Sequence, residues 1–245
     1  MRLEMKILSI GNSFSDDAQR YLREIAAKDG MEIETLNLCI GGCSLQRHAE
    51  NIKSGNREYL FHYNGDMYIE DLVTIEEGIS MREWDAVTLQ QVSTDSFVPE
   101  SFYPYIYEIA EYVRAKLPKA KIYIHMTWAY EHGCPRVFEV TGGHDADYML
   151  DGIRRAYTRA AREINADGII PSGELMELLY KAGAKNIYRD TFHASLGLAR
   201  YALGMLWYKF FTGRSVSDIS FEKLDESVST ADILLAKKCV DSFSL

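Results

Sequence analysis

The sequence predicts an α/β domain in three layers, with a mostly parallel sheet between two layers of helices. Short apolar segments typical of buried strands alternate along the chain with amphipathic segments typical of helices. The chain has 245 residues, 47% of them hydrophobic, which is enough to fill one large core. Because no internal repeat, low-complexity tract or Pro/Ser-rich linker interrupts this pattern, we expect a single domain over residues 1–245.

The first part of the chain contains two predicted strands with a helix between them. Residues 5–11 (MKILSIG) and residues 32–40 (EIETLNLCI) are apolar runs of strand length. Residues 16–30 begin with two acidic side chains, place apolar side chains on one face and end at Gly30. Acidic residues at the start and a glycine at the end are typical of a helix.

A β-hairpin is predicted next, over residues 59–71. The pair Asn64-Gly65 stands between two strand-like segments, and such a pair favours the tight turn of a two-residue hairpin. The hairpin interrupts the alternation of strands and helices. We therefore expect it to be a surface insertion near residues 57–72.

The rest of the chain continues the alternation. Apolar runs predict strands at residues 84–91, 120–128 and 168–171. Helical periodicity predicts helices at residues 103–117, 147–165 and 196–211. The glycine, proline and histidine residues of the segment 131–146 predict a long loop.

Several polar or small residues follow or end predicted strands. In an open parallel sheet, ligands bind outside the carboxyl ends of the strands. This rule places one set of side chains on a common rim: Ser13, Gly41, Gly42, Gln90, Gln91 and Trp128.

Charge and composition exclude some classes of function. The net charge is −9 and no basic block is present, so we do not expect a nucleic-acid partner. No segment has the length and apolarity of a membrane span, and the first residues do not have the features of a signal peptide. We therefore expect a cytoplasmic protein without a membrane partner.

The potential metal ligands show no recognisable spacing. The four cysteines are scattered, and Cys39 and Cys43 form a pair with no second pair to complete a zinc site. The six histidines lack the short spacings of known zinc motifs. We therefore expect neither a metal nor another cofactor.

Ser13 is the candidate nucleophile. It lies where a buried strand passes into a helix, and the free N–H groups of a helix N-terminus can face an anion. A serine hydroxyl becomes a good nucleophile only when a base takes its proton. The alternative is a helix-capping or turn serine, and Ser15 fits that description equally well.

Asp190 and His193 are the candidate partners of this serine. They stand three residues apart in the segment Asp-Thr-Phe-His, so the carboxylate can reach the imidazole ring within one tight turn. Such a bond would orient the ring and stabilise its charged form. A capping aspartate and a surface histidine are the alternative interpretation of the segment alone.

Four motifs together resemble the SGNH/GDSL hydrolase superfamily. They are IGNSFS near the N-terminus, IGG after the second strand, TLQQVS at the third strand and RDTFHAS near the C-terminus. The usual Gly-Asp-Ser opening is replaced by Gly11-Asn12-Ser13. The combination most resembles an uncharacterised branch of the superfamily, described only as a domain of unknown function and related to carbohydrate acetylesterases.

The resemblance implies a fold and a set of roles. It implies a flavodoxin-like sheet, with Ser13 as nucleophile, His193 as base and Asp190 as the acid that orients it. It further implies that the backbone N–H groups of Ser13 and Gly42, with Gly41 as the alternative, form an oxyanion hole.

The third oxyanion donor of the family is an asparagine in a Gly-x-Asn-Asp motif, which this chain lacks. The segment LQQVSTDS instead resembles the Gln-Gly-Glu segment of carbohydrate acetylesterases. We therefore expect Gln91 to be the side-chain donor, with Gln90 as the alternative. Asn12, Gln90 and Trp128 are further candidates for contact with substrate, although Trp128 could equally pack in the core or at the rim.

Taken together, the sequence predicts a serine esterase that hydrolyses a short-chain, acetyl-like ester, on a carbohydrate or another small molecule. Two alternatives remain open. An acyltransferase would use the same site with an alcohol in place of water, and a degenerate relative would bind a ligand without turnover. The sequence indicates neither the oligomeric state nor the identity of the substrate.

Overall fold

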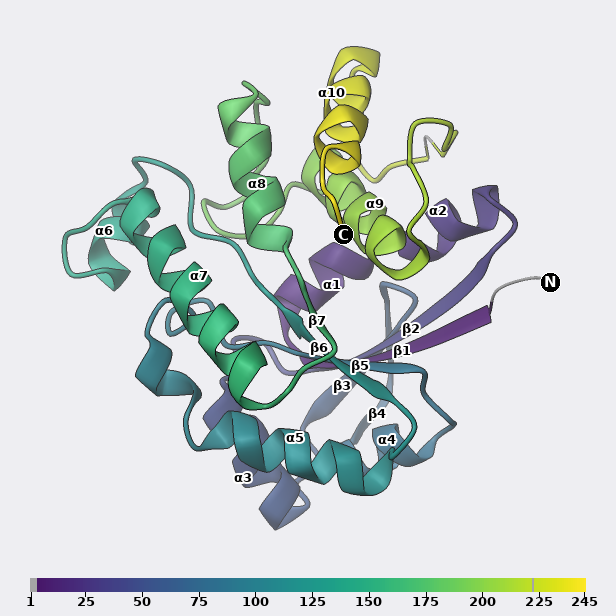
Figure 1. The fold of residues 1–245 in the computed structure, drawn as a ribbon, viewed down its shortest axis with the longest axis vertical. Helices are drawn as coiled ribbons and strands as arrows, with labels where there is room; N and C mark the ends of the chain where they lie inside the picture. The colour runs from purple at the N-terminus through teal and green to yellow at the C-terminus, as the bar shows by residue number, and fades with distance from the viewer. Residues whose placement is uncertain (1–3, 222) are drawn as a thin grey trace.

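The computed structural model describes residues 4–221 and 223–245 and shows a central sheet with helices on both faces (Figure 1). The α/β class predicted from the sequence is confirmed. The sheet has seven strands in the order β4-β3-β2-β1-β5-β6-β7. Their bounds are β1 (Glu4–Gly11), β2 (Glu32–Cys39), β3 (Tyr59–Tyr63), β4 (Asp66–Val73), β5 (Ala86–Leu89), β6 (Lys121–His125) and β7 (Gly168–Ile170).

The parallel part of the sheet has the flavodoxin-like order. Strand β1 pairs in parallel with β2 on one side and with β5 on the other, and β6 and β7 continue in parallel from β5. Numbered along the chain, these parallel strands follow the order 2-1-3-4-5. From β1 the chain first adds β2 on one side and later adds β5 on the other side. Ligands of such sheets bind beyond the carboxyl ends of the two strands where the order reverses, here β1 and β5.

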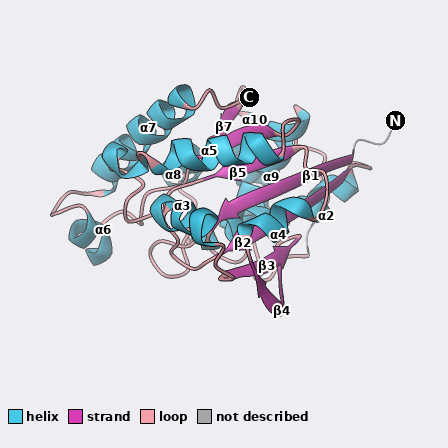
Figure 2. Ribbon diagram, turned by 90° about the horizontal axis from the view of Figure 1, so that it is seen from below, coloured by secondary structure: helices cyan, strands magenta, loops and turns pink. Residues whose placement is uncertain are grey.

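The hairpin lies at the edge of this sheet rather than outside it. Strand β3 pairs antiparallel with β2, and β4 pairs antiparallel with β3 (Figure 2). Asn64 and Gly65 at the turn have φ angles of 51° and 73°, as a tight hairpin turn of type I′ requires. The predicted turn is present, but the expected surface insertion is a two-stranded extension of the sheet.

Helices cover both faces of the sheet (Figure 1). One face carries α1 (Ser13–Gln19), α2 (Leu22–Lys28), α8 (Ser172–Lys181), α9 (Leu198–Thr212) and α10 (Thr230–Asp241). The other carries α3 (Leu45–Ser54), α4 (Ile75–Ser80), α5 (Tyr105–Lys116) and α7 (Ala146–Glu163), while α6 (Pro135–Val140) and a short 3-10 helix (Pro99–Phe102) lie in loops. None of the helices in the described ranges is both long enough and apolar enough to cross a membrane.

The two faces of the sheet give two hydrophobic cores. Along β1, the side chain of Ile7 enters the core beneath α9, whereas Leu8 and Ile10 enter the core beneath α5 and α7. Successive side chains of a strand point to opposite faces, so a strand covered on both sides reads as a continuous apolar run. This explains why the central strands were recognisable in the sequence.

Some helix boundaries differ from the prediction. The first helix begins at Ser13 instead of residue 16, because the Asn12 side chain accepts a hydrogen bond from the Phe14 N–H at 3.0 Å and caps it. The predicted helix 16–30 is two helices, α1 and α2. Helices α3, α4, α6, α8 and α10 are not among the predicted ones, and α6 lies within the predicted loop 131–146. The start of α4 has a sequence signal, a capping box in which the side chains of Thr74 and Glu77 each bind the other's backbone N–H.

A buried histidine connects the sheet to the helical layer at the carboxyl edge. His125, the last residue of β6, is fully buried. Its Nδ1 lies 2.6 Å from Gln90 Oε1 and its Nε2 lies 3.0 Å from Ser172 Oγ. Burial lowers the pKa of His125 from 6.5 to about 3, so the ring is neutral in the folded protein.

This histidine should make the fold sensitive to acid. Between pH 6.5 and about 3 the unfolded chain binds a proton at His125 that the folded chain does not. The free energy of unfolding should therefore decrease as the pH falls, by about 1.4 kcal/mol per pH unit for this group. In a His125→Gln variant, the free energy of unfolding, measured by urea denaturation between pH 6 and pH 4, should change less with pH, by about that amount per pH unit.

Above pH 7.5 the two proteins should show the same pH dependence, because His125 is then neutral in both states. The variant can differ in absolute stability, since it loses the original hydrogen bonds. Equal slopes in the two proteins between pH 6 and pH 4 would contradict a buried, neutral His125.

Candidate active site

Ser13 lies where β1 passes into α1, at the carboxyl edge of the sheet. The Asn12 cap fixes the start of the helix, and Ser13 is its first residue. The hydroxyl Oγ of Ser13 lies 2.8 Å from Nε2 of His193. Gly11 is required just before this turn, because a Cβ there would lie 2.4 Å from the Ser15 hydroxyl.

Asp190 holds the other side of the His193 ring. Its Oδ2 lies 2.7 Å from Nδ1 of His193, and its Oδ1 accepts the His193 backbone N–H at 2.8 Å. Burial opposes ionisation of Asp190, but the hydrogen bonds from the His193 side chain and backbone prevail and lower the pKa of Asp190 below its ordinary value. A charged carboxylate therefore faces the ring nitrogen.

The structure thus brings Ser13, His193 and Asp190 into one hydrogen-bonded chain, as expected from the sequence. Ser13 and His193 are separated by 180 positions in the chain. When Nδ1 carries the ring proton and donates a hydrogen bond to Asp190, Nε2 has a free lone pair that can accept the proton of the serine hydroxyl. Serine, base and orienting acid in this order can perform nucleophilic catalysis.

The backbone next to His193 is held by the segment that follows β6. The indole Nε1 of Trp128 donates to the Phe192 carbonyl at 2.8 Å, and the backbone N–H of Glu131 donates to the Thr191 carbonyl at 2.7 Å. Thr191 has a φ of 72°, an unfavourable conformation for a β-branched residue. These contacts hold the segment in a conformation that it would not adopt alone.

Trp128 was expected as a possible substrate contact, and the structure corrects this. Its side chain is fully buried, and its ring stacks on Phe14 with centroids 4.3 Å apart. Trp128 therefore supports the loop of His193 from the core side and does not face a ligand.

Two backbone N–H groups are available near Ser13. As the first residue of α1, Ser13 has no intrahelical acceptor for its own N–H. Gly42 is exposed, has a φ of 63° and, within the described chain, donates its N–H to no acceptor. The Asn12 amide donates to the Cys43 carbonyl at 3.3 Å, so this loop lies beside the turn of Ser13.

Gln91 does not face this site, contrary to expectation. Its Nε2 donates to the Ser101 carbonyl at 2.9 Å and to the Ser101 hydroxyl at 3.2 Å. Its Oε1 accepts the backbone N–H groups of Leu45 and Val92, each at 2.9 Å. The amide is buried and joins three loops, so it is not free to bind an oxyanion.

Gln90 and Asn12 are also buried and bind each other. The Gln90 Nε2 donates to Asn12 Oδ1 at 2.6 Å, and its Oε1 accepts the Ser15 hydroxyl at 2.7 Å in addition to facing His125. Neither side chain faces a substrate, which corrects the expectation for both. They instead support the turn of Ser13 from the core side.

Arg136, in the segment 131–146, lies near the site and was not among the predicted site residues. The guanidinium carbon of Arg136 lies 4.1 Å from the ring centroid of Phe192, and the Phe192 ring lies 4.0 Å from the ring of His193. Helix α6, which carries Arg136, therefore forms a wall near the base. A lone arginine in a glycine-rich loop gives no sequence signal of this position.

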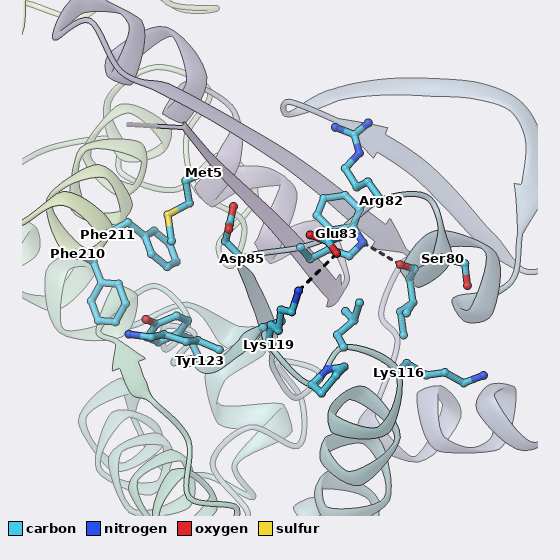
Figure 3. Close-up of a pocket in the computed structure, with 16 residues that line it drawn as sticks. Met5, Ser80, Arg82, Glu83, Asp85, Lys116, Lys119, Tyr123, Phe210 and Phe211 are labelled. Carbon is cyan, nitrogen blue, oxygen red and sulfur yellow. Dashed lines mark hydrogen bonds and ion pairs between the residues drawn. The ribbon is translucent and has the colours of Figure 1, made fainter. Parts of the chain in front are cut away.

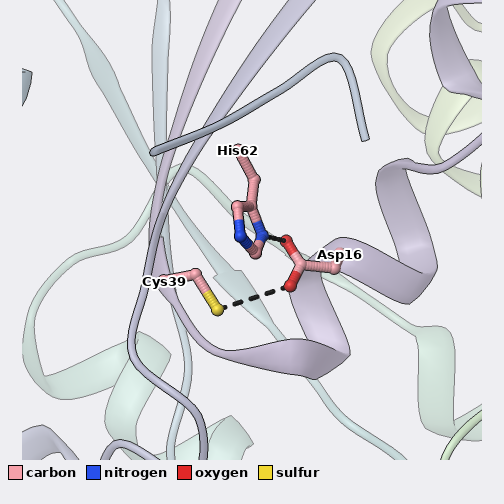
Figure 4. Close-up of side chains that lie close together, drawn as sticks. All are labelled: Asp16, Cys39 and His62. Carbon is pink, nitrogen blue, oxygen red and sulfur yellow. Dashed lines mark hydrogen bonds and ion pairs between the residues drawn. The ribbon is translucent and has the colours of Figure 1, made fainter. Parts of the chain in front are cut away.

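Asp16, Cys39 and His62 have the donor types of a metal site and lie close together (Figure 4). Their mutual contacts account for the arrangement: Asp16 faces His62 Nδ1 at 2.8 Å and accepts the Cys39 thiol at 3.3 Å. It also accepts the amide of Asn37 at 2.6 Å. Burial and the Asp16 charge raise the pKa of Cys39, so in the absence of a metal its sulfur is a thiol that donates to Asp16.

A second group of possible ligands lies near the loop 131–146. It consists of His132, Asp147 and Glu177. His132 Nε2 lies 3.0 Å from Glu177, and Lys181 pairs with the same carboxylate at 2.9 Å. The lysine therefore already supplies a positive charge to this group.

A cavity outside the candidate site lies at the opposite edge of the sheet. It has a volume of about 900 Å³ and opens at the amino ends of β1, β5 and β6, near Met5, Asp85 and Lys121 (Figure 3). Phe210 and Phe211 of α9 form part of its apolar wall. Since Ser13 and His193 lie at the carboxyl edge, this cavity is not part of the candidate active site.

Comparison with known proteins places the chain in a family. No curated protein shows significant similarity to it. A DUF4886 family protein from Bacteroides uniformis has a similar structure with a TM-score of 0.90, at 28% identity over 97% of this chain and 93% of that one.

More distant structures share the fold. A protein from Slackia heliotrinireducens assigned to the SGNH hydrolases has a TM-score of 0.62 at 21% identity, over 85% of this chain and 99% of that one. A family 3 carbohydrate esterase from Talaromyces cellulolyticus has a TM-score of 0.56 at 11% identity, over 88% and 100%. The family model of DUF4886, a domain of unknown function, matches residues 6–242, and the protein therefore belongs to the DUF4886 family.

Proposed function

We propose that the protein is a serine hydrolase that cleaves a carboxylic ester through an acyl-enzyme. The observation that carries this proposal is the hydrogen-bonded chain from Ser13 through His193 to Asp190, at the edge where open parallel sheets bind ligands. The fold shared with SGNH hydrolases and esterases supports the same reaction class.

In the first half of the reaction, Ser13 Oγ attacks the ester carbonyl carbon while His193 Nε2 takes the hydroxyl proton. Asp190 stabilises the imidazolium that forms. The N–H groups of Ser13 and Gly42 donate to the oxygen on which negative charge develops. His193 then gives its proton to the leaving alcohol, and the acyl group remains on Ser13.

In the second half, His193 takes a proton from a water molecule that attacks the acyl carbon. The bond to Ser13 Oγ breaks, the proton returns to Oγ, and a carboxylic acid leaves. Both halves use the same base and the same oxyanion donors. The His193 side chain is 18% exposed and Asp190 is 44% exposed, so water can reach the site.

For the substrate, we propose a short acyl group such as acetyl on a carbohydrate or similar alcohol. Two structures with the same fold support this choice, one described as a family 3 carbohydrate esterase and the other as an acetyl esterase with an acetate ion. The glutamine pair no longer supports it, because both amides have other partners.

A panel of p-nitrophenyl esters of increasing acyl length, together with acetylated sugars, tests this function. Short esters should be hydrolysed fastest. Ser13→Ala should lower kcat by on the order of 10³-fold or more, because no other group can form the acyl-enzyme. Ser15→Ala is the matched control: its hydroxyl lies on the same helix but binds Gln90, so its loss should have a far smaller effect.

Thermal unfolding should first establish that both serine variants are folded. Activity of Ser13→Ala close to that of the wild type would refute the nucleophile. Turnover only in the presence of an acceptor alcohol would indicate an acyltransferase, and no turnover with any ester would indicate a binding protein.

The position of Gln91 leads to a second prediction. Gln91→Ala removes the acceptor of two buried backbone N–H groups, and each unpaired group costs about 1–3 kcal/mol. The free energy of unfolding, measured with urea, should decrease by that order. The kcat of the folded variant should fall less than about tenfold, because the amide does not face the oxyanion.

Gln46→Ala is the control for this experiment. Gln46 is exposed on α3, and among the residues that the structure describes its side chain binds only Glu50, at 2.9 Å. Its replacement should therefore change neither the free energy of unfolding nor kcat. A loss of 10²- to 10³-fold in kcat for Gln91→Ala, with unchanged stability, would instead indicate an oxyanion donor.

A further inference from the structure

A buried carboxylate connects the helix of Ser13 to the segment of His193. Asp17 lies one helical turn after Ser13 on α1 and is fully buried. Its Oδ1 accepts from Arg189 Nη1 and from Arg200 Nε, each at 2.8 Å. Its Oδ2 accepts the backbone N–H of Ala194 at 3.0 Å.

Two of these partners immediately flank the candidate acid and base. Arg189 precedes Asp190, and Ala194 follows His193. The Arg189 backbone N–H donates to the His193 carbonyl at 3.1 Å, and its guanidinium donates to the Ala194 carbonyl. The segment 189–194 is therefore a closed loop, and Asp17 ties both of its ends to α1.

The other anchors of this loop come from a different part of the fold. Trp128 and Glu131 bind the carbonyls of Phe192 and Thr191, and both belong to the chain that follows β6. The Asp17 contacts instead join the loop to α1, the helix on which Ser13 stands, alongside the Ser13–His193 bond itself and the Phe14 ring, whose centroid lies 5.7 Å from that of His193. They therefore bear directly on the distance between Ser13 and His193.

Of the two arginines that bind Asp17, Arg189 of the loop depends on it more than Arg200 does. Burial raises the pKa of Asp17, and the charges of Arg200 and Arg189 oppose this shift. Arg200 has a second carboxylate, Asp225, at 3.6 Å. Arg189 has no such second ion pair in the described part of the chain, so it depends on Asp17 for its charge partner.

We propose that Asp17 is a positioning residue, which holds the segment 189–194 so that His193 keeps its hydrogen bonds to both Asp190 and Ser13. This inference rests on the proposed function for its kinetic consequence, but the geometry that it concerns can be measured without turnover. Small misplacements of reacting groups reduce rates strongly, which is why a residue that touches no substrate can matter.

The test replaces the carboxylate by an amide in Asp17→Asn. The kcat for the best ester should fall by about 10²-fold with little change in KM, because positioning and not substrate binding is lost. The downfield proton resonance of the His193 Nδ1–H···Asp190 bond should weaken or disappear. This resonance is assigned by its absence from a His193→Gln variant.

Glu174→Gln is the matched control. Glu174 binds Arg154 through two hydrogen bonds of 2.6 Å, and this pair lies on α7 and α8 away from the segment 189–194. The same chemical change there should leave kcat and the resonance as in the wild type. A general effect of losing an arginine–carboxylate pair would alter both variants alike.

The inference is overturned if folded Asp17→Asn keeps the wild-type kcat and resonance, or if kcat falls while the resonance is unchanged. If this variant does not fold, Arg189→Gln replaces it and must weaken the resonance; an unchanged resonance then overturns the inference. If the wild type hydrolyses no ester, the proposed function fails, whereas the resonance still decides whether Asp17 positions His193.

Discussion

The hydrogen bond between Ser13 Oγ and His193 Nε2 is the interaction on which the candidate site depends. It joins the exit of the first strand to a segment 180 positions later, over a distance of 2.8 Å. Such closeness requires the flavodoxin-like sheet, which brings the start of α1 and the segment before α9 to the same edge. The buried Asp17 ion pairs and the Trp128 hydrogen bond then fix the loop on either side of the ring.

A layer of buried polar groups lies directly behind this bond. Asn12, Ser15, Gln90 and His125 are each almost fully buried, and each binds another member of the group. Burying a polar group is costly unless it is hydrogen-bonded, so these groups support one another and leave little freedom to the turn of Ser13. The same requirement explains why the glutamine amides are not available to a substrate.

The five parallel strands and the pairing of Asp190 with His193 could be predicted from local signals, whereas the link from Ser13 to His193, 180 positions apart, rested on the resemblance to the SGNH/GDSL superfamily. Apolar runs identify buried strands, and the spacing of Asp190 and His193 allows a bond within one turn. The donors could not be predicted in the same way. Whether Gln91 faces a cleft or the core is decided by Ser101 and Leu45. Trp128 is buried because its ring stacks on Phe14 and its indole N–H binds the Phe192 carbonyl.

The reactivity of Ser13 is the most direct test of the account. Intact-protein mass spectrometry after treatment with a fluorophosphonate should show one added phosphonyl group, located on Ser13 by peptide mapping. His193→Gln should slow this labelling strongly, because the base that removes the hydroxyl proton is absent. A folded wild-type protein that remains unlabelled at Ser13, or that is labelled equally fast without His193, would contradict an activated serine at this site.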